Sequence, residues 1–383
     1  MSKRKVLVFI DWYLPGFKAG GPIRSCANLV EHLSDEFEFL IVTRNTDYTD
    51  SVPYPSIQSD TWVRREDGSS VYYFSEEKLN RKNIRNLIRG TDFDAVYLNG
   101  IYSVYFTLYP LVYLRKKSDK QVVVAVRGML AESAIQIKKG KKQFFLRAVK
   151  VLRLFNSVVF HATTAHEEMD IVAQFGSDAK VVVAGNLAAK QNIAVNPPRI
   201  KQEGKLSLVS IARVSPEKNL LYALQLLEGI KNVEIDFDIY GPVYDENYWA
   251  ECKKVIAGLP VNIRVEYAGS LESEKVAMIL SKYHFLFMPT TGENFGHVIL
   301  QALSAGCALL ISDKTPWRNL EARRCGWDLP LEKPGYFQTA LQACARLNQA
   351  EFNLLSGNAF AFAQQYLHDP KTALENRRLF RKD

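Results

Sequence analysis

The sequence predicts an α/β protein with two domains, each built on a parallel sheet. Short apolar runs alternate along the chain with stretches whose apolar residues recur at helical spacing. This alternation is typical of βαβ units, which require parallel strands. The chain has 383 residues, more than a single hydrophobic core usually serves. A polar segment with two adjacent prolines, residues 192–205, separates two such series, so we expect it to link the domains.

The first expected domain covers residues 1–191. After its first strand comes a loop with several glycines and prolines, and then a helix with apolar residues at 27, 29, 30 and 33. Strands are expected at 6–11, 39–43, 95–99, 122–126, 158–162 and 181–184.

The second expected domain covers residues 206–365. Strands are expected at 206–214, 235–240, 263–268, 285–289 and 309–312. The helix after the first of these should begin with Ser215 as the N-cap and Pro216 as the first helical residue. A last helical region, about 360–380, should break or kink at Pro370.

The segment 285–313 predicts a strand, a loop, a helix and a second strand. Its loop carries Glu293 and Gly296 directly before the helix. A helix N-terminus presents unpaired backbone N–H groups and a partial positive charge, so it favours an anion. An acid at this place would repel a phosphate, but it accepts hydrogen bonds from hydroxyl groups. A phosphate and a polyol together indicate a nucleotide sugar.

Two cations lie beside the first strand of the second half. Arg213 is near the end of strand 206–214, and Lys218 follows it closely. The carboxyl ends of parallel strands are where open sheets bind ligands. An arginine fork and a lysine point charge suit a diphosphate. Taken alone, the pair would pass as surface charges beside a turn; together with the loop at Glu293, phosphate binding is favoured.

These motifs resemble the donor-site signature of the family 4 glycosyltransferases, which have the GT-B fold. That signature has two glutamates separated by seven residues, the first just before a phenylalanine–glycine pair. Here Glu293 precedes Phe295 and Gly296, and Gln301 stands in place of the second glutamate. The resemblance implies that Glu293 contacts the transferred sugar and that Gln301, without a charge, faces the ribose. It also implies that Arg213 and Lys218 bind the donor diphosphate.

The remaining donor residues also come from this resemblance. Asn294 and His297 flank the phenylalanine–glycine pair, and backbone groups of Ser270 and Leu271 correspond to those that contact the nucleotide base. In the first domain, Gly20 and Gly21 occupy the place where paired glycines approach the diphosphate. Residues 366–383 correspond to a C-terminal helix that returns to the first domain.

Arg127 follows strand 122–126, where many family members have a histidine. An arginine stays protonated, so it cannot serve as a general base. It would stabilise the leaving diphosphate or an acidic group of the acceptor. An ion pair between the domains is an equally compatible role.

Positive charge is concentrated in one part of the first half. Residues 101–150 hold 11 Lys and Arg against 2 Asp and Glu. The helix expected around 136–155 combines basic residues with an apolar stripe, which suits an anionic membrane surface. A solvated helix with its stripe on the domain core is the ordinary alternative, and no nucleic-acid motif accompanies the charge. The predicted membrane or acceptor surface comprises Lys138, Lys139, Lys141, Lys142, Arg147 and Lys150.

Other classes of protein are disfavoured by the composition. The five cysteines have no metal-ligand or redox spacing, and no apolar run has the length of a membrane span. No Asp-x-Asp metal motif lies near the expected donor site, so we expect neither a metal nor another cofactor. These features favour a cytoplasmic protein, peripheral on the inner face of the cytoplasmic membrane.

The expected function is a retaining transfer of a sugar from a UDP- or GDP-sugar to a hydroxyl acceptor. A lipid-linked saccharide of a bacterial surface polysaccharide pathway is the favoured acceptor. Two alternatives remain open: another GT-B enzyme, such as a nucleotide-sugar 2-epimerase, and a non-catalytic sugar-nucleotide-binding scaffold. Gln301, in place of the second glutamate, is compatible with a scaffold, whereas the presence of Arg213, Lys218 and Glu293 argues against this alternative.

Overall fold

The structure, a computed structural model, divides into two compact units. The described residues are 3–115, 120–136, 139–190 and 197–381. The first unit comprises Met1–Lys190 and Asp369–Asp383, and the second comprises Gln191–His368.

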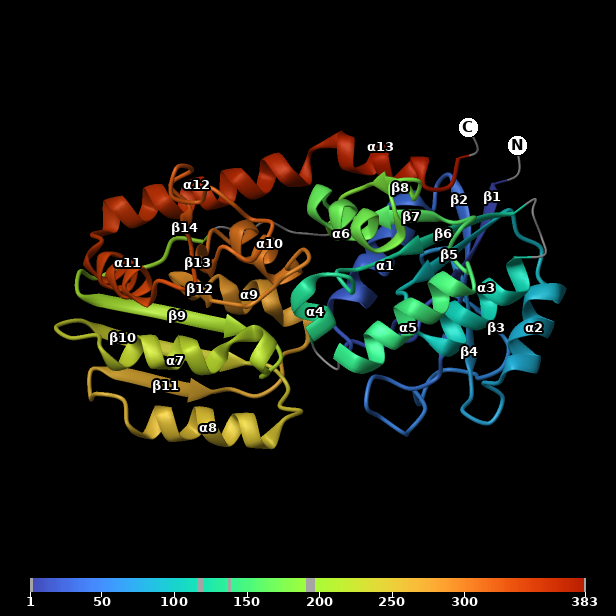
Figure 1. The fold of residues 1–383 in the computed structure, drawn as a ribbon. Helices are drawn as coiled ribbons and strands as arrows, with labels where there is room; N and C mark the ends of the chain where they lie inside the picture. The colour runs from blue at the N-terminus through green and yellow to red at the C-terminus, as the bar shows by residue number, and fades with distance from the viewer. Residues whose placement is uncertain (1–2, 116–119, 137–138, 191–196, 382–383) are drawn as a thin grey trace. The chain divides into compact units, whose positions relative to one another are not determined.

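The first unit contains an eight-stranded sheet in the order β3-β4-β2-β1-β5-β6-β7-β8 (Figure 1). All neighbouring strands are parallel except β3, which runs antiparallel to β4. The strands are β1 Arg4–Phe9, β2 Phe37–Arg44, β3 Trp62–Arg64, β4 Ser70–Phe74, β5 Ala95–Asn99, β6 Gln121–Ala125, β7 Val159–Ala162 and β8 Lys180–Val183.

Helices cover both faces of this sheet, because alternate strand residues point to opposite sides. Along β1, Leu7 and Phe9 belong to one buried core, whereas Val6 and Val8 belong to another that includes residues of α1. The helices are α1 Gly21–Leu33, α2 Arg81–Gly90, α3 Tyr109–Leu114, α4 Glu132–Gln136, α5 Lys139–Val151, α6 Ala165–Phe175 and α13 Pro370–Arg378, with a π-helical turn at Val104–Leu108. The unit is therefore a three-layer sandwich.

The second unit contains a six-stranded, wholly parallel sheet in the order β11-β10-β9-β12-β13-β14. The strands are β9 Lys205–Ile211, β10 Glu234–Tyr240, β11 Ile263–Tyr267, β12 Phe285–Met288, β13 Ala308–Ser312 and β14 Gly326–Leu329. The helices are α7 Leu220–Glu228, α8 Glu246–Ala257, α9 Val276–Leu280, α10 His297–Ser304, α11 Pro334–Arg346 and α12 Gln349–Leu367, with 3-10 turns at Pro216–Lys218 and Ser273–Lys275.

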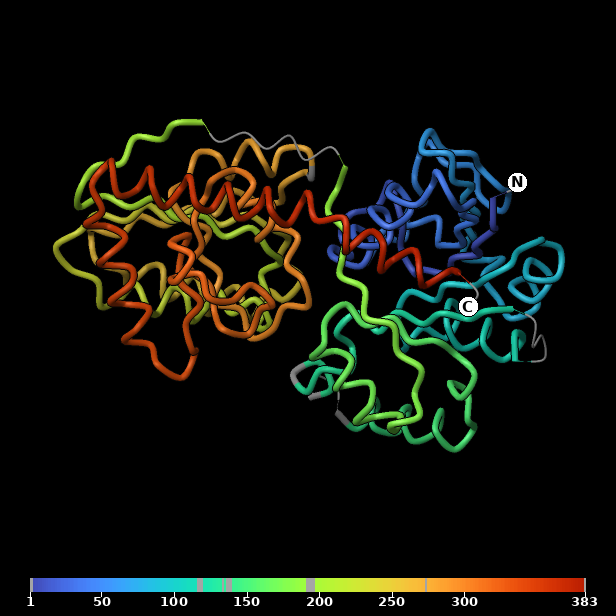
Figure 2. Tube along the Cα trace, turned by 90° about the horizontal axis from the view of Figure 1, so that it is seen from above, coloured from blue at the N-terminus to red at the C-terminus, as the bar shows by residue number. Residues whose placement is uncertain are grey.

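The C-terminal segment belongs to the first unit. Figure 2 follows the chain from α12 into α13. The helix breaks at Pro370, as the sequence predicts, and the Asp369 side chain accepts a hydrogen bond from the backbone N–H of Lys371 at 2.9 Å. Beyond α13, the Phe380 ring is fully buried and lies 5.5 Å from the ring of Phe37 and 5.7 Å from that of Tyr97. These contacts attach the segment to the sheet of the first unit.

Part of the predicted linker, 192–205, packs on the second unit. Residues 191–196 lie outside the described residues. The part that follows packs on the second unit, because the buried Arg199 guanidinium donates to the carbonyl oxygens of Tyr283 and Ala305 at 2.9 and 2.8 Å. This polar, proline-containing segment therefore includes a buried arginine that attaches it to the second unit.

Candidate functional site

Two loops of the second unit meet at the carboxyl ends of β9 and β12, which are neighbours in the sheet. The Asn219 side-chain amide donates to the carbonyl oxygen of Pro289 at 2.9 Å. The backbone N–H of Thr291 donates to the carbonyl oxygen of Glu217 at 2.9 Å, and the Thr290 hydroxyl donates to the same oxygen at 2.9 Å. The loop after β9 and the loop after β12 thus form one rigid surface, at the edge where parallel sheets bind ligands.

Lys218 and Glu293 form an ion pair across these two loops. The Lys218 ammonium lies 2.7 Å from Glu293 Oε2, and the side chains are only 14% and 18% exposed. Such partial burial limits screening by solvent, so the two charges hold each other in place. The sequence predicted both residues for the donor site, and the structure brings them into contact.

The start of the helix after β9 differs from the prediction. Ser215 and Pro216 were expected to begin it, but Pro216–Lys218 forms a 3-10 turn and α7 begins at Leu220. The reason is Asn219, which has a φ of 59° and whose side chain is bound to the loop after β12. A left-handed residue interrupts a helix. This interruption leaves Lys218 in the turn that reaches Glu293.

Arg213 lies two residues beyond β9 and is more exposed. Its guanidinium is 3.5 Å from Glu217 Oε2, and both side chains are more than a third exposed. Surface pairs of this kind contribute little to stability, so the guanidinium can turn toward an anion at small cost. Gly241, with a φ of 146°, approaches the same strand end, and a Cβ there would lie 1.8 Å from the carbonyl oxygen of Ala212. Only glycine permits this approach.

The loop before α10 presents backbone donors. In the described part of the chain, the N–H groups of Phe295 and Gly296 have no hydrogen-bond acceptor. Gly296 precedes the helix with a φ of 75°, and a Cβ there would lie 2.7 Å from Ile299 Cδ1. The Trp317 indole N–H donates to the carbonyl oxygen of Phe295 at 2.5 Å. The buried Trp317 side chain therefore helps to fix the loop before α10.

The other predicted donor residues of this unit occupy nearby elements. His297 is the first residue of α10, and its ring lies 4.8 Å from that of Phe295. Asn294 precedes Phe295, and Gln301 lies one turn into α10; both are half-buried.

Ser270 and Leu271 follow β11, at the sheet edge beyond β10. The backbone N–H of Gly241 donates to the carbonyl oxygen of Gly269 at 2.8 Å, which joins the two strand ends. No hydrogen bond among the described residues connects Ser270 or Leu271 with Lys218 or Glu293.

Residues 193–321 match the family model for glycosyl transferases group 1. This region contains Arg213, Lys218, Glu293 and Gln301. The match thus covers the part of the chain that holds these predicted donor residues. No curated protein matches the chain.

Solved structures with the GT-B fold resemble the whole chain. The Anabaena protein Alr3699/HepE, crystallised with UDP and glucose, is 13% identical, with 98% of each chain covered and a TM-score of 0.69. A sucrose-phosphate synthase from Thermosynechococcus elongatus is 13% identical, with 99% of this chain and 98% of that chain covered and a TM-score of 0.73. WaaG, a glycosyltransferase involved in lipopolysaccharide biosynthesis, is 12% identical, with 98% of each chain covered and a TM-score of 0.58. The fold is GT-B, and together with the match of residues 193–321 to the group 1 model it supports a glycosyltransferase.

In the first unit, Gly20 and Gly21 lie at the start of α1. Gly20 has a φ of 73° and precedes the helix. A Cβ at either position would meet no atom within 4 Å among the described residues. The space beside both glycines is therefore open, and their contact with a diphosphate stays a prediction.

Arg127 is built into the first unit. Its side chain is buried, and the guanidinium donates to Asn99 Oδ1 at 2.9 Å, Asn186 Oδ1 at 2.6 Å and the Tyr97 hydroxyl at 2.7 Å. Tyr97 and Asn99 lie on β5 and Asn186 follows β8, and none of the three was identified from the sequence. The sequence expected Arg127 to meet an anion; the structure gives its donors neutral partners within the unit.

The network around Arg127 continues to His161. The Tyr97 hydroxyl is 2.8 Å from His161 Nδ1, and His161 Nε2 is 2.8 Å from the carbonyl oxygen of Ala184. Burial, together with the nearby Arg127 charge, lowers the pKa of His161 to about 3. His161 is therefore neutral at physiological pH.

The basic helix α5 packs some of its apolar side chains on the core and exposes others. Leu146 and Val149 are buried in the core, whereas the Phe144 and Val151 side chains are 75% and 82% exposed. Lys141, Arg147 and Lys150 are exposed beside them.

The other predicted lysines of this surface are not all equivalent. Lys142 donates to the carbonyl oxygen of Ala134 at 2.6 Å and lies over the Tyr102 ring, so its ammonium has internal partners. Lys139 begins α5, and Lys138 lies outside the described residues.

Two features are absent from the described residues. No helix there is both long and apolar enough to cross a membrane. The same part of the chain holds no group of three or more His, Cys, Asp or Glu side chains suited to a metal ion.

Proposed function

We propose that the chain is a retaining glycosyltransferase that moves a sugar from a UDP- or GDP-sugar to a hydroxyl acceptor. The observation that carries this proposal is the 2.7 Å ion pair between Lys218 and Glu293, placed beside Arg213 within a group 1 domain. A cation and an acid held at one sheet edge suit the two chemically different ends of a nucleotide sugar.

Each charged group has a distinct role in this proposal. Arg213 and Lys218 bind the diphosphate and stabilise the negative charge that develops on it as the bond to the sugar breaks. The N–H groups of Phe295 and Gly296 donate to phosphate oxygens at the start of α10. Glu293 accepts hydrogen bonds from sugar hydroxyls and keeps Lys218 oriented before the donor arrives.

The reaction replaces one bond at the anomeric carbon by another on the same face. The bond to the diphosphate oxygen breaks and its electron pair stays on that oxygen, while the acceptor oxygen bonds to the anomeric carbon and passes its proton to the departing diphosphate. Two cationic side chains supply the stabilisation that a metal gives in other enzymes, so we include metal independence in the proposal. The first nucleotide to test is UDP, because HepE was crystallised with it.

A direct assay separates this function from its alternatives. The full chain is incubated with UDP-, GDP- and ADP-sugars, with and without lipid-linked saccharide acceptors, and the products are followed by NMR. A glycosyltransferase releases nucleotide diphosphate and gives a product with the anomeric configuration of the donor. A changed nucleotide sugar formed without acceptor would identify an epimerase, and no turnover of any donor would favour a scaffold.

The proposed acceptor is a lipid-linked saccharide of a surface polysaccharide, reached by peripheral binding to the inner face of the cytoplasmic membrane. Exposed Phe144 and Val151, with Arg147 and Lys150 on the same helix, suit insertion among anionic headgroups. The involvement of WaaG in lipopolysaccharide biosynthesis supports such a setting.

Vesicle flotation tests the membrane proposal. We expect the chain to float with vesicles that contain anionic lipid and to lose most of this binding when Arg147 and Lys150 are both changed to Glu. Changing Lys253 and Lys254, two exposed lysines of α8, to Glu alters the net charge equally and should leave flotation unchanged. A wild-type chain that does not float would contradict peripheral membrane binding.

A further inference from the structure

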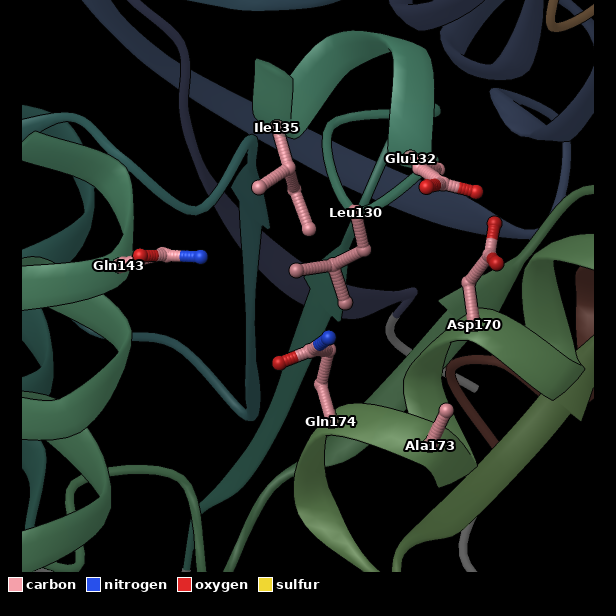
Figure 3. A pocket seen from close by; sticks show the side chains of 7 residues that line it. All are labelled: Leu130, Glu132, Ile135, Gln143, Asp170, Ala173 and Gln174. Carbon is pink, nitrogen blue, oxygen red and sulfur yellow. The ribbon is translucent and has the colours of Figure 1, made fainter. Parts of the chain in front are cut away.

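A hollow of about 330 Å³ lies in the first unit, bounded by α4, α5, α6 and the segment after β6. Figure 3 shows Leu130 and Ile135 pointing into its centre, with the carboxylates of Glu132 and Asp170 facing each other at one side. The lining is Leu130, Glu132, Ile135, Gln143, Asp170, Ala173 and Gln174. Its size is at the lower end of small-molecule sites, about 300–1,000 Å³, and suits a single ring.

The polar side chains of this pocket are available to a ligand. Within the described residues, Glu132, Gln143, Asp170 and Gln174 make no hydrogen bond or ion pair. Asp170 and Gln174 are half-buried, and burial raises the pKa of Asp170 above its usual value. Glu132 and Gln143 are exposed and can be hydrated, whereas the half-buried Asp170 and Gln174 gain most when water or a ligand completes their hydrogen bonds.

The chemistry of the lining excludes anions. It contains two carboxylates and two amides but neither Lys nor Arg, although residues 101–150 as a whole are strongly basic. Carboxylates accept hydrogen bonds from hydroxyl or ammonium groups and repel phosphates and other carboxylates. Leu130 and Ile135 offer an apolar surface for the C–H face of a ring.

Buried contacts hold the walls of the pocket rigid. The Glu167 carboxylate, on α6 one turn before Asp170, accepts from the backbone N–H groups of Gly128 and Thr163. Arg127, next to Gly128, is fixed by its own three acceptors. Lys142 joins α5 to α4 through the carbonyl oxygen of Ala134. A binding site is effective when such contacts fix its residues beforehand.

We propose that this pocket binds one uncharged or amine-bearing sugar ring of the acceptor. The proposal rests on the proposed glycosyltransferase function and adds the class of acceptor: the ring seated here carries hydroxyl or amino groups and no acidic group. The Asp170 and Glu132 carboxylates accept from its hydroxyl or ammonium donors, and the Gln143 and Gln174 amides provide both donors and acceptors.

Ligand-observed NMR titration of the full chain tests the pocket with methyl glucoside, methyl glucosaminide and methyl glucuronide. We expect saturable binding of the first two and at least tenfold weaker binding of the glucuronide. In Asp170→Asn and Glu132→Gln, which keep the shape but remove a charge, affinity for the glucosaminide should fall about tenfold, since a charge-assisted hydrogen bond is lost. Asp178→Asn, an exposed site just beyond α6, should change nothing.

Three results would overturn the proposal: no saturable binding of the neutral sugar, equal binding of the glucuronide, or affinities unchanged in both pocket variants. UDP binding is measured on the same samples. Sugar binding without UDP binding would contradict the donor function and support the pocket proposal. UDP binding without sugar binding would support the donor function and contradict the pocket proposal.

Discussion

The two units place charged side chains at the same topological position, the carboxyl ends of parallel strands, but use them differently. In the second unit, the Arg213 side chain is more than a third exposed, and Lys218 is paired with Glu293, whose side chain is 18% exposed. In the first unit, Arg127 is buried, and all three of its side-chain nitrogens donate to neutral acceptors.

This difference shows that position in a sheet does not by itself make a charge functional. The decisive feature is the set of partners. A cation whose donors are already satisfied inside a domain stabilises that domain, whereas one held by a partly exposed acid can exchange that contact for a ligand. We therefore propose that the second unit binds the donor and that Arg127 has a structural role.

The largest effect is expected from Lys218→Met. Loss of the cation nearest Glu293 should lower kcat by about 100- to 1,000-fold, the range found when a charge-stabilising group is removed from an active site. The melting temperature should fall as well, because Glu293 loses its partner in a pair that is mostly buried, so turnover is measured well below it. Turnover of the donor sugar measures the effect, and Lys231→Met, an exposed lysine of the same unit, is the matched control. If turnover fell no more in Lys218→Met than in the control, Lys218 would have no role in the donor site.

Arg127→Met should act on stability instead. It leaves three buried acceptors without their donor, at a cost of about 3 kcal/mol, which lowers the melting temperature by about 6–12 °C in a domain of this size. Arg89→Met on the exposed surface of α2 should have almost no effect. A variant with unchanged melting but lost turnover would show that Arg127 acts on the substrate, as the sequence suggested.

A smaller effect is expected on the pH dependence of the first unit. Because the pKa of His161 is lowered to about 3, the unfolded chain binds this proton below about pH 6.5 while the folded chain does not. The free energy of unfolding should therefore fall as pH decreases from about 6.5 toward 3. In His161→Gln the slope of the unfolding free energy against pH should be shallower, by an amount that corresponds to the uptake of at most one proton on unfolding. Equal slopes in urea unfolding series of the two proteins would contradict the buried neutral histidine.

Much of the fold follows from the sequence, and the exceptions have a physical reason. The interior strands, such as β5 and β12, are continuous apolar runs because both faces are buried. The strands that the sequence missed, β3, β4 and β14, carry mixed polar and aromatic residues; β3 and β14 lie at sheet edges. Edge strands need not be apolar, so periodicity alone does not reveal them.

The candidate site was predictable as a set of residues but not as a geometry. Spacing placed Lys218 and Glu293 near one strand edge, yet their direct contact depends on Asn219 interrupting the helix. The environment of Arg127 depends on Asn99 and Asn186, which are far from it in sequence and carry no motif. Partners chosen by the tertiary fold leave no local signal.

The most direct test of donor binding at the second unit is calorimetric titration of the full chain with UDP and GDP. We expect one nucleotide to bind in the micromolar range and Arg213→Ala to weaken it at least tenfold, through loss of charge-assisted hydrogen bonds to the diphosphate. Arg89→Met should bind like the wild type. Equal affinity in Arg213→Ala, or no binding of either nucleotide to the wild type, would contradict a donor site at this sheet edge.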